Sequence, residues 1–404
     1  SALWYNNVQN HWETNFTPLT TAELGYYDIR VMVEDTDGDY SNWTTYDNAI
    51  NVISNPPLVT GYNVTESEIL RTETSLISIE VYDIEDDSRN MSLVVQYMSL
   101  SGNWSVDYLS ELYYNPETDV WETSFTPNIT SELGDYDIRV KVIDLDGGES
   151  AWSVYEDNIT VGNNLPIFYD YLLTYDKDYD VLDMQNVTLL RTNSILIYIN
   201  STDIEDIPSI HEVIIESRSP TGVWTSEYIS WANNQSQSPD YHDAYYFTPD
   251  KEAELGFYDM RIMINDTDGG SSNWSIFNQV FNITNNKPEF GMYYDSNLSV
   301  LRNHSITLGF TALDIENELD ELTVVIEHRS PQGDWSSNHL SNLVYNSGKN
   351  QWTILFSPDS EYELGNYSLR AMFTDVDNDS TGWIQNNSTY LFVINNNPNL
   401  VGYE

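Results

Sequence analysis

The chain has 404 residues, of which 40% are hydrophobic and 13% aromatic, so it can build buried cores and wholesale disorder is not expected. Its 64 acidic and 15 basic residues give a formal net charge of −49, which argues against binding to nucleic acids or anionic membranes, because both need Lys and Arg contacts. The chain has no cysteine, which excludes a disulfide framework and thiol redox chemistry.

The chain shows neither a membrane anchor nor a secretion signal. No apolar run reaches the length of about 18 residues that a membrane-spanning helix requires. Residue 1 is Ser rather than Met. We therefore expect a processed or truncated chain, or a stretch cut from a longer array of domains.

Short motifs recur along the chain at matching spacings. The tripeptide Glu-Leu-Gly ends at glycines that lie 109, 122 and 109 residues apart, namely Gly25, Gly134, Gly256 and Gly365. A proline lies seven residues before each glycine and a tyrosine lies two residues after it. This regular recurrence predicts tandem domains.

Stretches rich in Asn and Pro mark the domain boundaries, because proline cannot continue a strand ladder. We predict the C-terminal half of a domain at 1–55, a domain at 56–164, a domain at 165–286 with an insert near 169–183, a domain at 287–396, and the start of a further repeat at 397–404. The incomplete first domain fits a piece of a longer array, or a subunit whose half-domain is completed by strands from a neighbour.

The clearest predicted strand follows each Glu-Leu-Gly. In the first repeat, Tyr27, Ile29, Val31 and Val33 alternate with mostly charged residues, which is the pattern of a strand with one buried face. Similar stretches predict about seven strands in about 110 residues, with turn signals every 8–12 residues or so and no competing helix. The fold class predicted is therefore all-β, with seven-stranded Ig-like β-sandwiches in an extended tandem array.

Recurring aromatic and basic residues are expected to be structural. The tyrosine after each Glu-Leu-Gly should form a tyrosine corner, in which its hydroxyl bonds back to the preceding loop. Trp104, Trp224 and Trp335 should pack in the core or at a hairpin edge rather than form a platform for sugars. Nine of the ten arginines fall at repeat-equivalent positions, and we expect them to be ion-pair partners on the sheet faces.

Acidic turns occur twice in each complete repeat. Turns that begin Asp-Ile-Glu should occupy the B–C loops and Asp-x-Asp turns the F–G loops, which lie at the same end of an Ig-like sandwich. Clustered carboxylates repel one another unless a cation lies among them, and Ca²⁺ takes about six to eight oxygen ligands in flexible geometry. A bound ion would stiffen the joint with the preceding domain. A solvated turn without metal explains the same residues, because Asp-Gly is ordinary turn chemistry.

The candidate Ca²⁺ ligands are Asp35, Asp37, Asp83, Glu85, Asp86, Asp144, Asp146, Asp203, Glu205, Asp206, Asp266, Asp268, Asp314, Glu316, Asp375 and Asp377.

Glycosylation sequons are frequent. Nineteen of the 42 asparagines lie in Asn-x-Ser/Thr, against about 8 expected from the Ser and Thr content. We therefore expect N-linked glycans on some of these sites, which implies an extracellular chain. The candidate sites are Asn15, Asn42, Asn63, Asn90, Asn103, Asn128, Asn158, Asn186, Asn200, Asn234, Asn265, Asn273, Asn282, Asn297, Asn303, Asn366, Asn378, Asn386 and Asn387.

The stretch ELGDYDIRVKVIDLDGGESAW (132–152) resembles the end of PKD-like, cadherin-like and bacterial Ig-like domains that occur in tandem on prokaryotic surfaces. The Cys-free, acidic, sequon-rich version is most similar to archaeal surface-layer and surface-fibre glycoproteins. The resemblance implies tandem Ig-like domains outside a cell. The chain lacks the full linker calcium motifs of true cadherins.

No catalytic motif appears, the six histidines share no repeat position, and we expect no enzyme. The expected function is a structural extracellular glycoprotein of the cell surface, a segment or subunit of a surface layer, stalk or filament that self-associates and that bound Ca²⁺ would stiffen. The alternative is a cell-surface adhesin or carbohydrate-binding protein, for which Trp231 in the third repeat would be the first residue to test. Adaptation to high salt also explains the acidity.

Overall fold

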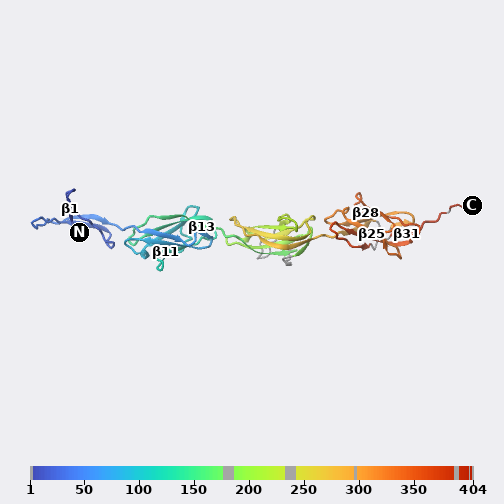
Figure 1. Cartoon of the computed structure of the whole chain (residues 1–404), viewed down its shortest axis with the longest axis horizontal. Coiled ribbons are helices and arrows are strands. Elements are labelled where there is room, and N and C mark those ends of the chain that lie inside the picture. Colours follow the sequence, from blue (N-terminus) through green and yellow to red (C-terminus); the bar gives the residue numbers. More distant parts are fainter. Residues whose placement is uncertain are drawn as a thin grey trace. The chain divides into compact units, whose positions relative to one another are not determined.

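The computed structural model describes residues 3–175, 186–232, 243–294, 298–385, 391–399 and 401–402. Two compact units are present, one of Ser1–Leu165 with Asp203–Asp206 and the other of Pro166–Thr202 with Ile207–Glu404. Nearly all regular structure in the described ranges is β-strand (Figure 1), and the 3-10 helices η1 (Ser88–Asn90) and η2 (Pro208–Ile210) are short. In these ranges, no helix is long and apolar enough to cross a membrane.

Residues 3–55, called domain 1, form two hairpins. The first pairs β1 (Trp4–Asn6) with β2 (His11–Glu13), and the second pairs β3 (Gly25–Val31) with β4 (Thr44–Val52). Their apolar residues remain exposed, as Trp12 at 62% and Val31 at 41% illustrate. In domain 1 as described, these hairpins have no second sheet to cover them.

Residues 56–164, called domain 2, form two facing sheets. One sheet has the order β10-β11-β7-β5 and the other β6-β13-β12-β8-β9. The first strand is split, because β5 pairs antiparallel with β7 while β6 pairs in parallel with β13 in the other sheet. This strand order is that of an Ig-like sandwich, and the predicted fold class is confirmed. The strands are β5 (Leu58–Val64), β6 (Glu68–Leu70), β7 (Ser75–Tyr82), β8 (Ser92–Met98), β9 (Trp104–Ser105), β10 (Tyr113–Asn115), β11 (Val120–Phe125), β12 (Gly134–Ile143) and β13 (Ser153–Gly162).

Domain 3, residues 165–286, repeats this arrangement with sheets β14-β16-β19-β18 and β15-β21-β20-β17. Its strands are β14 (Ile167–Thr174), β15 (Val187–Leu190), β16 (Ile195–Thr202), β17 (Glu212–Arg218), β18 (Ile229–Trp231), β19 (Asp243–Phe247), β20 (Gly256–Asn265) and β21 (Ser275–Thr284). The predicted insert near 169–183 begins inside β14, and its residues 176–183 lie outside the described residues.

Domain 4, residues 287–396, has sheets β22-β24-β28-β27 and β23-β31-β29-β25-β26, with β30 paired to β29. Its strands are β22 (Glu289–Tyr294), β23 (Leu298–Leu301), β24 (Ile306–Leu313), β25 (Thr323–Arg329), β26 (Trp335–Ser336), β27 (Leu340–Asn346), β28 (Gln351–Phe356), β29 (Gly365–Thr374), β30 (Ile384–Gln385) and β31 (Leu391–Ile394). Residues 397–399 and 401–402 carry no strand.

The strand after each Glu-Leu-Gly supplies the core of its sandwich. β12, β20 and β29 share one alternation of buried and half-buried side chains. In β12, Ile138 and Val140 are fully buried, and they belong to the same cluster as Ile77 and Ile79 from the opposite sheet. The predicted period of two is therefore confirmed, and the hydrophobic effect of this buried face holds the two sheets together.

The backbone conformation explains why the Glu-Leu-Gly motif ends in glycine. Gly134 has φ of 117°, a left-handed conformation that favours glycine. Two residues later, the Tyr136 hydroxyl donates to the Glu132 carbonyl oxygen at 2.9 Å, and Tyr27 and Tyr367 make the same bond in their own domains. The tyrosine corner is confirmed at these three positions, and Tyr258 is buried at the equivalent place in domain 3.

The tyrosine corner gives a first prediction. Replacing Tyr136→Phe should destabilise domain 2 by about 1 kcal/mol, because a buried phenol bond is lost and the packing is kept. Segment-resolved hydrogen exchange of β12 measures this loss. The control is Tyr82→Phe, since Tyr82 is 55% exposed and should have no effect. Equal exchange in both variants would show that the corner bond contributes nothing.

Candidate functional site

The candidate functional sites are three polar joints. Each joint is formed by a linker asparagine (Asn55, Asn164 or Asn286) and the acidic loops of the domain that follows it. In the first compact unit, the linker residues Ser54 and Asn55 precede domain 2. Glu85, in the loop after β7, accepts hydrogen bonds from the Asn55 backbone N–H at 3.0 Å and from Asn55 Nδ2 at 2.7 Å. The Ser54 hydroxyl donates to Asp144 in the loop after β12 at 2.9 Å. The linker is therefore bonded to both acidic loops of the next domain.

The two acidic loops of domain 2 are adjacent, as the sequence predicted. Asp86 accepts a bond from the Leu145 backbone N–H at 3.1 Å, which ties one loop to the other. Asp83 is 7% exposed, and its Oδ1 accepts from the Glu85 and Asp86 backbone N–H groups. Its other oxygen, Oδ2, is buried without a hydrogen-bond partner. A buried carboxylate oxygen in this state is costly unless an ion or water reaches it.

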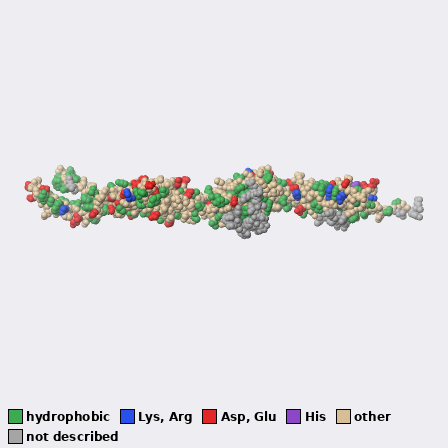
Figure 2. Space-filling view, turned by 90° about the horizontal axis from the view of Figure 1, so that it is seen from below, with side chains coloured by type: hydrophobic (Ala, Val, Ile, Leu, Met, Phe, Trp, Pro, Cys, Tyr) green, Lys and Arg blue, Asp and Glu red, His purple; other side chains and the backbone are tan. Residues whose placement is uncertain are grey.

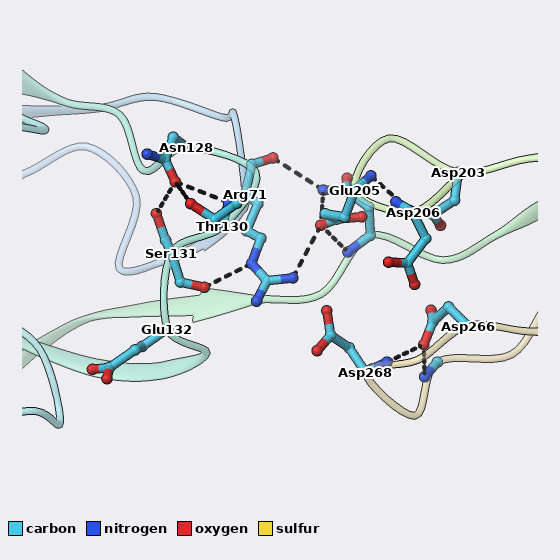
Figure 3. A network of polar contacts seen from close by, with 12 residues as sticks. Arg71, Asn128, Thr130, Ser131, Glu132, Asp203, Glu205, Asp206, Asp266 and Asp268 are labelled. Atoms are coloured by element: carbon cyan, nitrogen blue, oxygen red, sulfur yellow. Dashed lines mark hydrogen bonds and ion pairs between the residues drawn. The ribbon is translucent and has the colours of Figure 1, made fainter. Parts of the chain in front are cut away.

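The second joint joins an arginine to a buried glutamate (Figure 3). Arg71 Nε donates to the Ser131 carbonyl oxygen at 2.8 Å, and its Nη1 lies 3.8 Å from Glu205 Oε1. Asn164 Nδ2 donates to the Arg71 carbonyl oxygen at 3.0 Å and to Glu205 Oε1 at 2.8 Å. The Arg71 and Glu205 side chains are only 8% and 3% exposed, so this pair is desolvated. All of these residues belong to the first compact unit.

The surroundings of Glu205 in the second joint disfavour its charged form. Burial raises the pKa of Glu205, and the nearby Asp203 raises it further, while bonds from Asn164 oppose the shift. Asp203 Oδ2 and Glu205 Oε2 are both buried without a hydrogen-bond partner. Two like charges in such surroundings favour either a proton or a bound cation.

The third joint, in the second compact unit, uses the same residue types. Asn286 Nδ2 donates to the Arg191 carbonyl oxygen at 2.9 Å and to Glu316 Oε1 at 2.7 Å. Arg191 Nη1 bonds Asp377 at 2.7 Å. Asn285 Nδ2 donates to Asp375 at 2.8 Å. The linker asparagine thus bridges the preceding domain and the acidic loop of the following one.

The third joint also leaves buried oxygens without partners. Asp314 Oδ2, Glu316 Oε2 and Asn317 Oδ1 have no hydrogen-bond partner. Asp314 Oδ1, by contrast, accepts from the Glu316 and Asn317 backbone N–H groups. The same position of the loop therefore offers an unpaired carboxylate oxygen in domains 2, 3 and 4.

The joint arginines correct part of the sequence interpretation. We expected the repeat-equivalent arginines on the sheet faces, but Arg71, Arg191 and Arg302 lie next to the linkers. Their Nε atoms donate to the carbonyl oxygens of Ser131, Ala253 and Tyr362, each two residues before a Glu-Leu-Gly leucine. Their own carbonyl oxygens accept from the linker asparagines Asn164, Asn286 and Asn396. A bond to a backbone carbonyl needs no complementary side chain, so sequence pairing could not reveal it.

The other repeat-equivalent arginines do lie on sheet faces, where they stack on tryptophans. The guanidinium carbon of Arg139 lies 4.2 Å from the ring centre of Trp104 and 4.1 Å from that of Trp152. Arg261 lies between Trp224 and Trp274, and Arg370 between Trp335 and Trp383, in the same way. Arg261 and Arg370 also pair with Glu216 and Glu327. The edge tryptophans thus serve as structural cation–π partners.

The predicted Ca²⁺ ligands fall into two classes of loop. Those that follow β7, β16 and β24 are Asp83, Glu85, Asp86, Asp203, Glu205, Asp206, Asp314 and Glu316. Those that follow β3, β12, β20 and β29 are Asp35, Asp37, Asp144, Asp146, Asp266, Asp268, Asp375 and Asp377. Over the described ranges, no three His, Cys, Asp or Glu side chains are grouped closely enough to hold a metal ion. A cation at these loops would therefore need carbonyl, amide or water oxygens as well.

Most sequon asparagines lie where a glycan could be attached. The exposed ones are Asn15, Asn42, Asn63, Asn90, Asn103, Asn128, Asn186, Asn273, Asn303, Asn366 and Asn378. The half-buried ones are Asn158, Asn200, Asn265 and Asn282. Asn234, Asn297, Asn386 and Asn387 lie outside the described residues. Asn158 Oδ1 accepts a bond from the Tyr62 hydroxyl at 2.7 Å, which makes it a less accessible site than the exposed ones.

Comparisons with known proteins give only distant structural likenesses. No family model matches the chain, and no curated protein matches it. The titin domains Z1Z2 in complex with telethonin are 14% identical, with TM-score 0.31, over 58% of this chain and 98% of that chain. Drosophila N-cadherin EC1-4 is 11% identical, with TM-score 0.24, over 92% and 83% of the two chains. The Escherichia coli adhesin FdeC is 13% identical, with TM-score 0.23, over 85% and 99%. Likenesses this distant carry no argument about function.

The second joint gives a testable prediction. Replacing Arg71→Met should favour opening of the joint by about 3 kcal/mol, roughly a hundredfold in the opening equilibrium, because the buried Glu205 carboxylate loses its cation. Hydrogen exchange at the Asn164 amide measures the opening. Arg89→Met is the control, since the Arg89 side chain is 64% exposed and pairs with the exposed Asp87. Unchanged exchange in Arg71→Met would mean that Arg71 does not hold the joint.

Proposed function

We propose that the chain is a segment of a structural extracellular glycoprotein that forms part of a surface layer, stalk or filament. The bonds of the linker asparagines are the observation that carries this proposal. Asn55 and Asn286 are each bonded to the glutamate of the next domain within one compact unit. Asn164 and Glu205 make the same bond at the second joint. A flexible tether would not need the same side-chain bond at three joints, whereas a load-bearing array of Ig-like domains would.

Composition and surface chemistry support an extracellular place for this array. Eleven of the fifteen described sequon asparagines are exposed, so glycans can be accommodated without disturbing the cores. Glycans and the net charge of −49 would keep the sides of the array soluble. The proposal assigns the chain no catalytic activity, and its partners are other copies of the same chain.

Electron microscopy of the native material tests the structural role directly. We expect regular filaments or a two-dimensional lattice, because self-association of identical subunits produces ordered assemblies. Isolated rods that project from cells would exclude a lattice or filament and leave the stalk and the adhesin alternative. In that case Trp231, which is 61% exposed and lies 6.0 Å from the Tyr245 ring, is the aromatic residue to test for carbohydrate binding.

Ca²⁺ is proposed as the ion that stiffens the joints. The support is the unpaired, buried oxygen of Asp83, which recurs at Asp203 and Asp314, together with the unpaired Glu205 and Glu316 oxygens. Carboxylate and amide oxygens are the ligands that Ca²⁺ prefers, and a bound ion would remove the repulsion among them. Asn317 Oδ1 offers an additional amide oxygen at the third joint.

Thermal unfolding tests the ion. Millimolar Ca²⁺ should raise the Tm of the chain by on the order of 5 °C relative to chelator, because only the folded joints bind it. Asp83→Asn combined with Asp314→Asn should remove most of this shift, while Asp146→Asn, at an exposed position, should not. The same Tm with Ca²⁺ and with chelator would exclude the ion. An equal shift with NaCl of matched ionic strength would indicate screening of an acidic chain adapted to salt.

A further inference from the structure

Domain 4 buries a histidine where domain 2 buries a tyrosine. His328 in β25 pairs with Leu369, and Tyr97 in β8 pairs with Ile138 at the same register of the sandwich. Both partners lie two residues after the corner tyrosine of their domain. His328 is 2% exposed and Tyr97 is 5% exposed, so both rings belong to the core region. Domain 3 has the buried Ser217 at this position.

The residue of domain 4 that is equivalent to Tyr108, the stacking partner of Tyr97, is also a histidine. In domain 2, Tyr97 stacks on Tyr108 with ring centres 4.9 Å apart and planes 5° apart. Tyr108 lies four residues after Trp104, and the residue four after Trp335 is His339. At these two positions domain 4 has imidazoles, which can be protonated in acid, where domain 2 has tyrosines, which stay neutral. The two histidines lie with Tyr362 along one cavity of about 190 Å³.

The surroundings of His328 suit only the neutral ring. Its Nε2 lies 2.6 Å from the Asn338 carbonyl oxygen, so the tautomer with a proton on Nε2 fits, while its buried Nδ1 has no hydrogen-bond partner. Protonation would place a second N–H and a positive charge there without an acceptor. The Tyr362 hydroxyl lies 3.0 Å from Nε2 and the Phe356 ring centre lies 5.1 Å from the imidazole centre, and neither group offers a compensating charge.

The charged and titratable groups around the cavity leave the neutral form of His328 favoured. Asp334, Glu363, Tyr362 and Tyr367 line the cavity. On the strand of His328 itself, Glu327 pairs with Arg370 and Arg329 stacks on Trp335. Arg302 donates to the Tyr362 carbonyl oxygen. His339 lies 3.8 Å from Asp359 and 4.4 Å from the Tyr362 ring. Burial lowers the pKa of His328 and a charged His339 lowers it further, while Asn338 and Glu327 oppose the shift.

We infer that domain 4 contains an acid-sensitive contact, in which protonation of His328 releases the segment Trp335–His339 and Tyr362 from β25. The direction follows from linkage. The opened state binds the proton at the ordinary histidine pKa of about 6.5, above that of the closed state, so the contact is fully stable above this pH and weakens as the pH falls below it. Domain 2, with its tyrosines, has no such dependence at this position. This inference does not depend on the proposed structural role.

Hydrogen exchange of the whole chain tests the inference with an internal control. Between about pH 7.5 and about pH 5.5, the protection factors of Thr323–Asn346 should fall by up to about tenfold per pH unit once the pH is below about 6.5, after correction for intrinsic exchange. The matching segment of domain 2, Ser92–Asn115, should keep its protection. An equal fall in both segments, or none in domain 4, would overturn the inference.

Variants that carry the residue of domain 2 or domain 3 at this position test whether His328 causes the fall in protection. His328→Tyr introduces the residue of domain 2 and should abolish the fall in protection. If that variant has lost protection already at neutral pH, His328→Ser, with the residue of domain 3, takes its place. His339→Tyr should keep the fall, because the buried imidazole remains. A fall that persists in a folded His328 variant would refute the assignment.

Discussion

A carboxylate that accepts its hydrogen bonds mainly from neutral donors is the interaction on which each joint depends. Glu205 has a side chain only 3% exposed, and the Asn164 side chain and backbone N–H both donate to it. Glu316 is held by Asn286 in the same way. With 64 acidic against 15 basic residues, most carboxylates have no cation to pair with. Asparagine amides and backbone N–H groups therefore do what Lys and Arg do in less acidic proteins.

Nine of the ten arginines lie at the joints or on the sheet faces, where each guanidinium has a structural partner. Figure 2 shows Asp and Glu side chains in many places on the visible face and Lys and Arg in only a few. Of the ten arginines, three lie at the joints and six stack on tryptophans of the sheet faces, while Arg89 lies at a short 3-10 helix with Asp87. A planar guanidinium can bond a carbonyl and a carboxylate at once or lie flat between two indole rings. The compact ammonium of lysine has no planar face to lie flat between two indole rings, which explains the preference for arginine on the sheet faces.

Much of the fold could be read from the sequence because its signals are local. The alternation in β12, the glycine with positive φ and the corner tyrosine all act within a dozen residues. The joint arginines were placed wrongly because their partners are backbone carbonyl groups about 60 residues away, as for Arg71 and Ser131. The exchange of Tyr97 for His328 was also missed. Aligning those two residues needs the strand register, and no shared motif marks the position.

The split first strand has a mechanical consequence. In each complete domain its second piece runs parallel to the last strand, as β6 does to β13, β15 to β21 and β23 to β31. A force that pulls the two ends of a domain apart slides such strands along each other, so their hydrogen bonds bear the force together rather than breaking one by one. A domain built in this way resists stretching more strongly than its thermal stability alone would indicate.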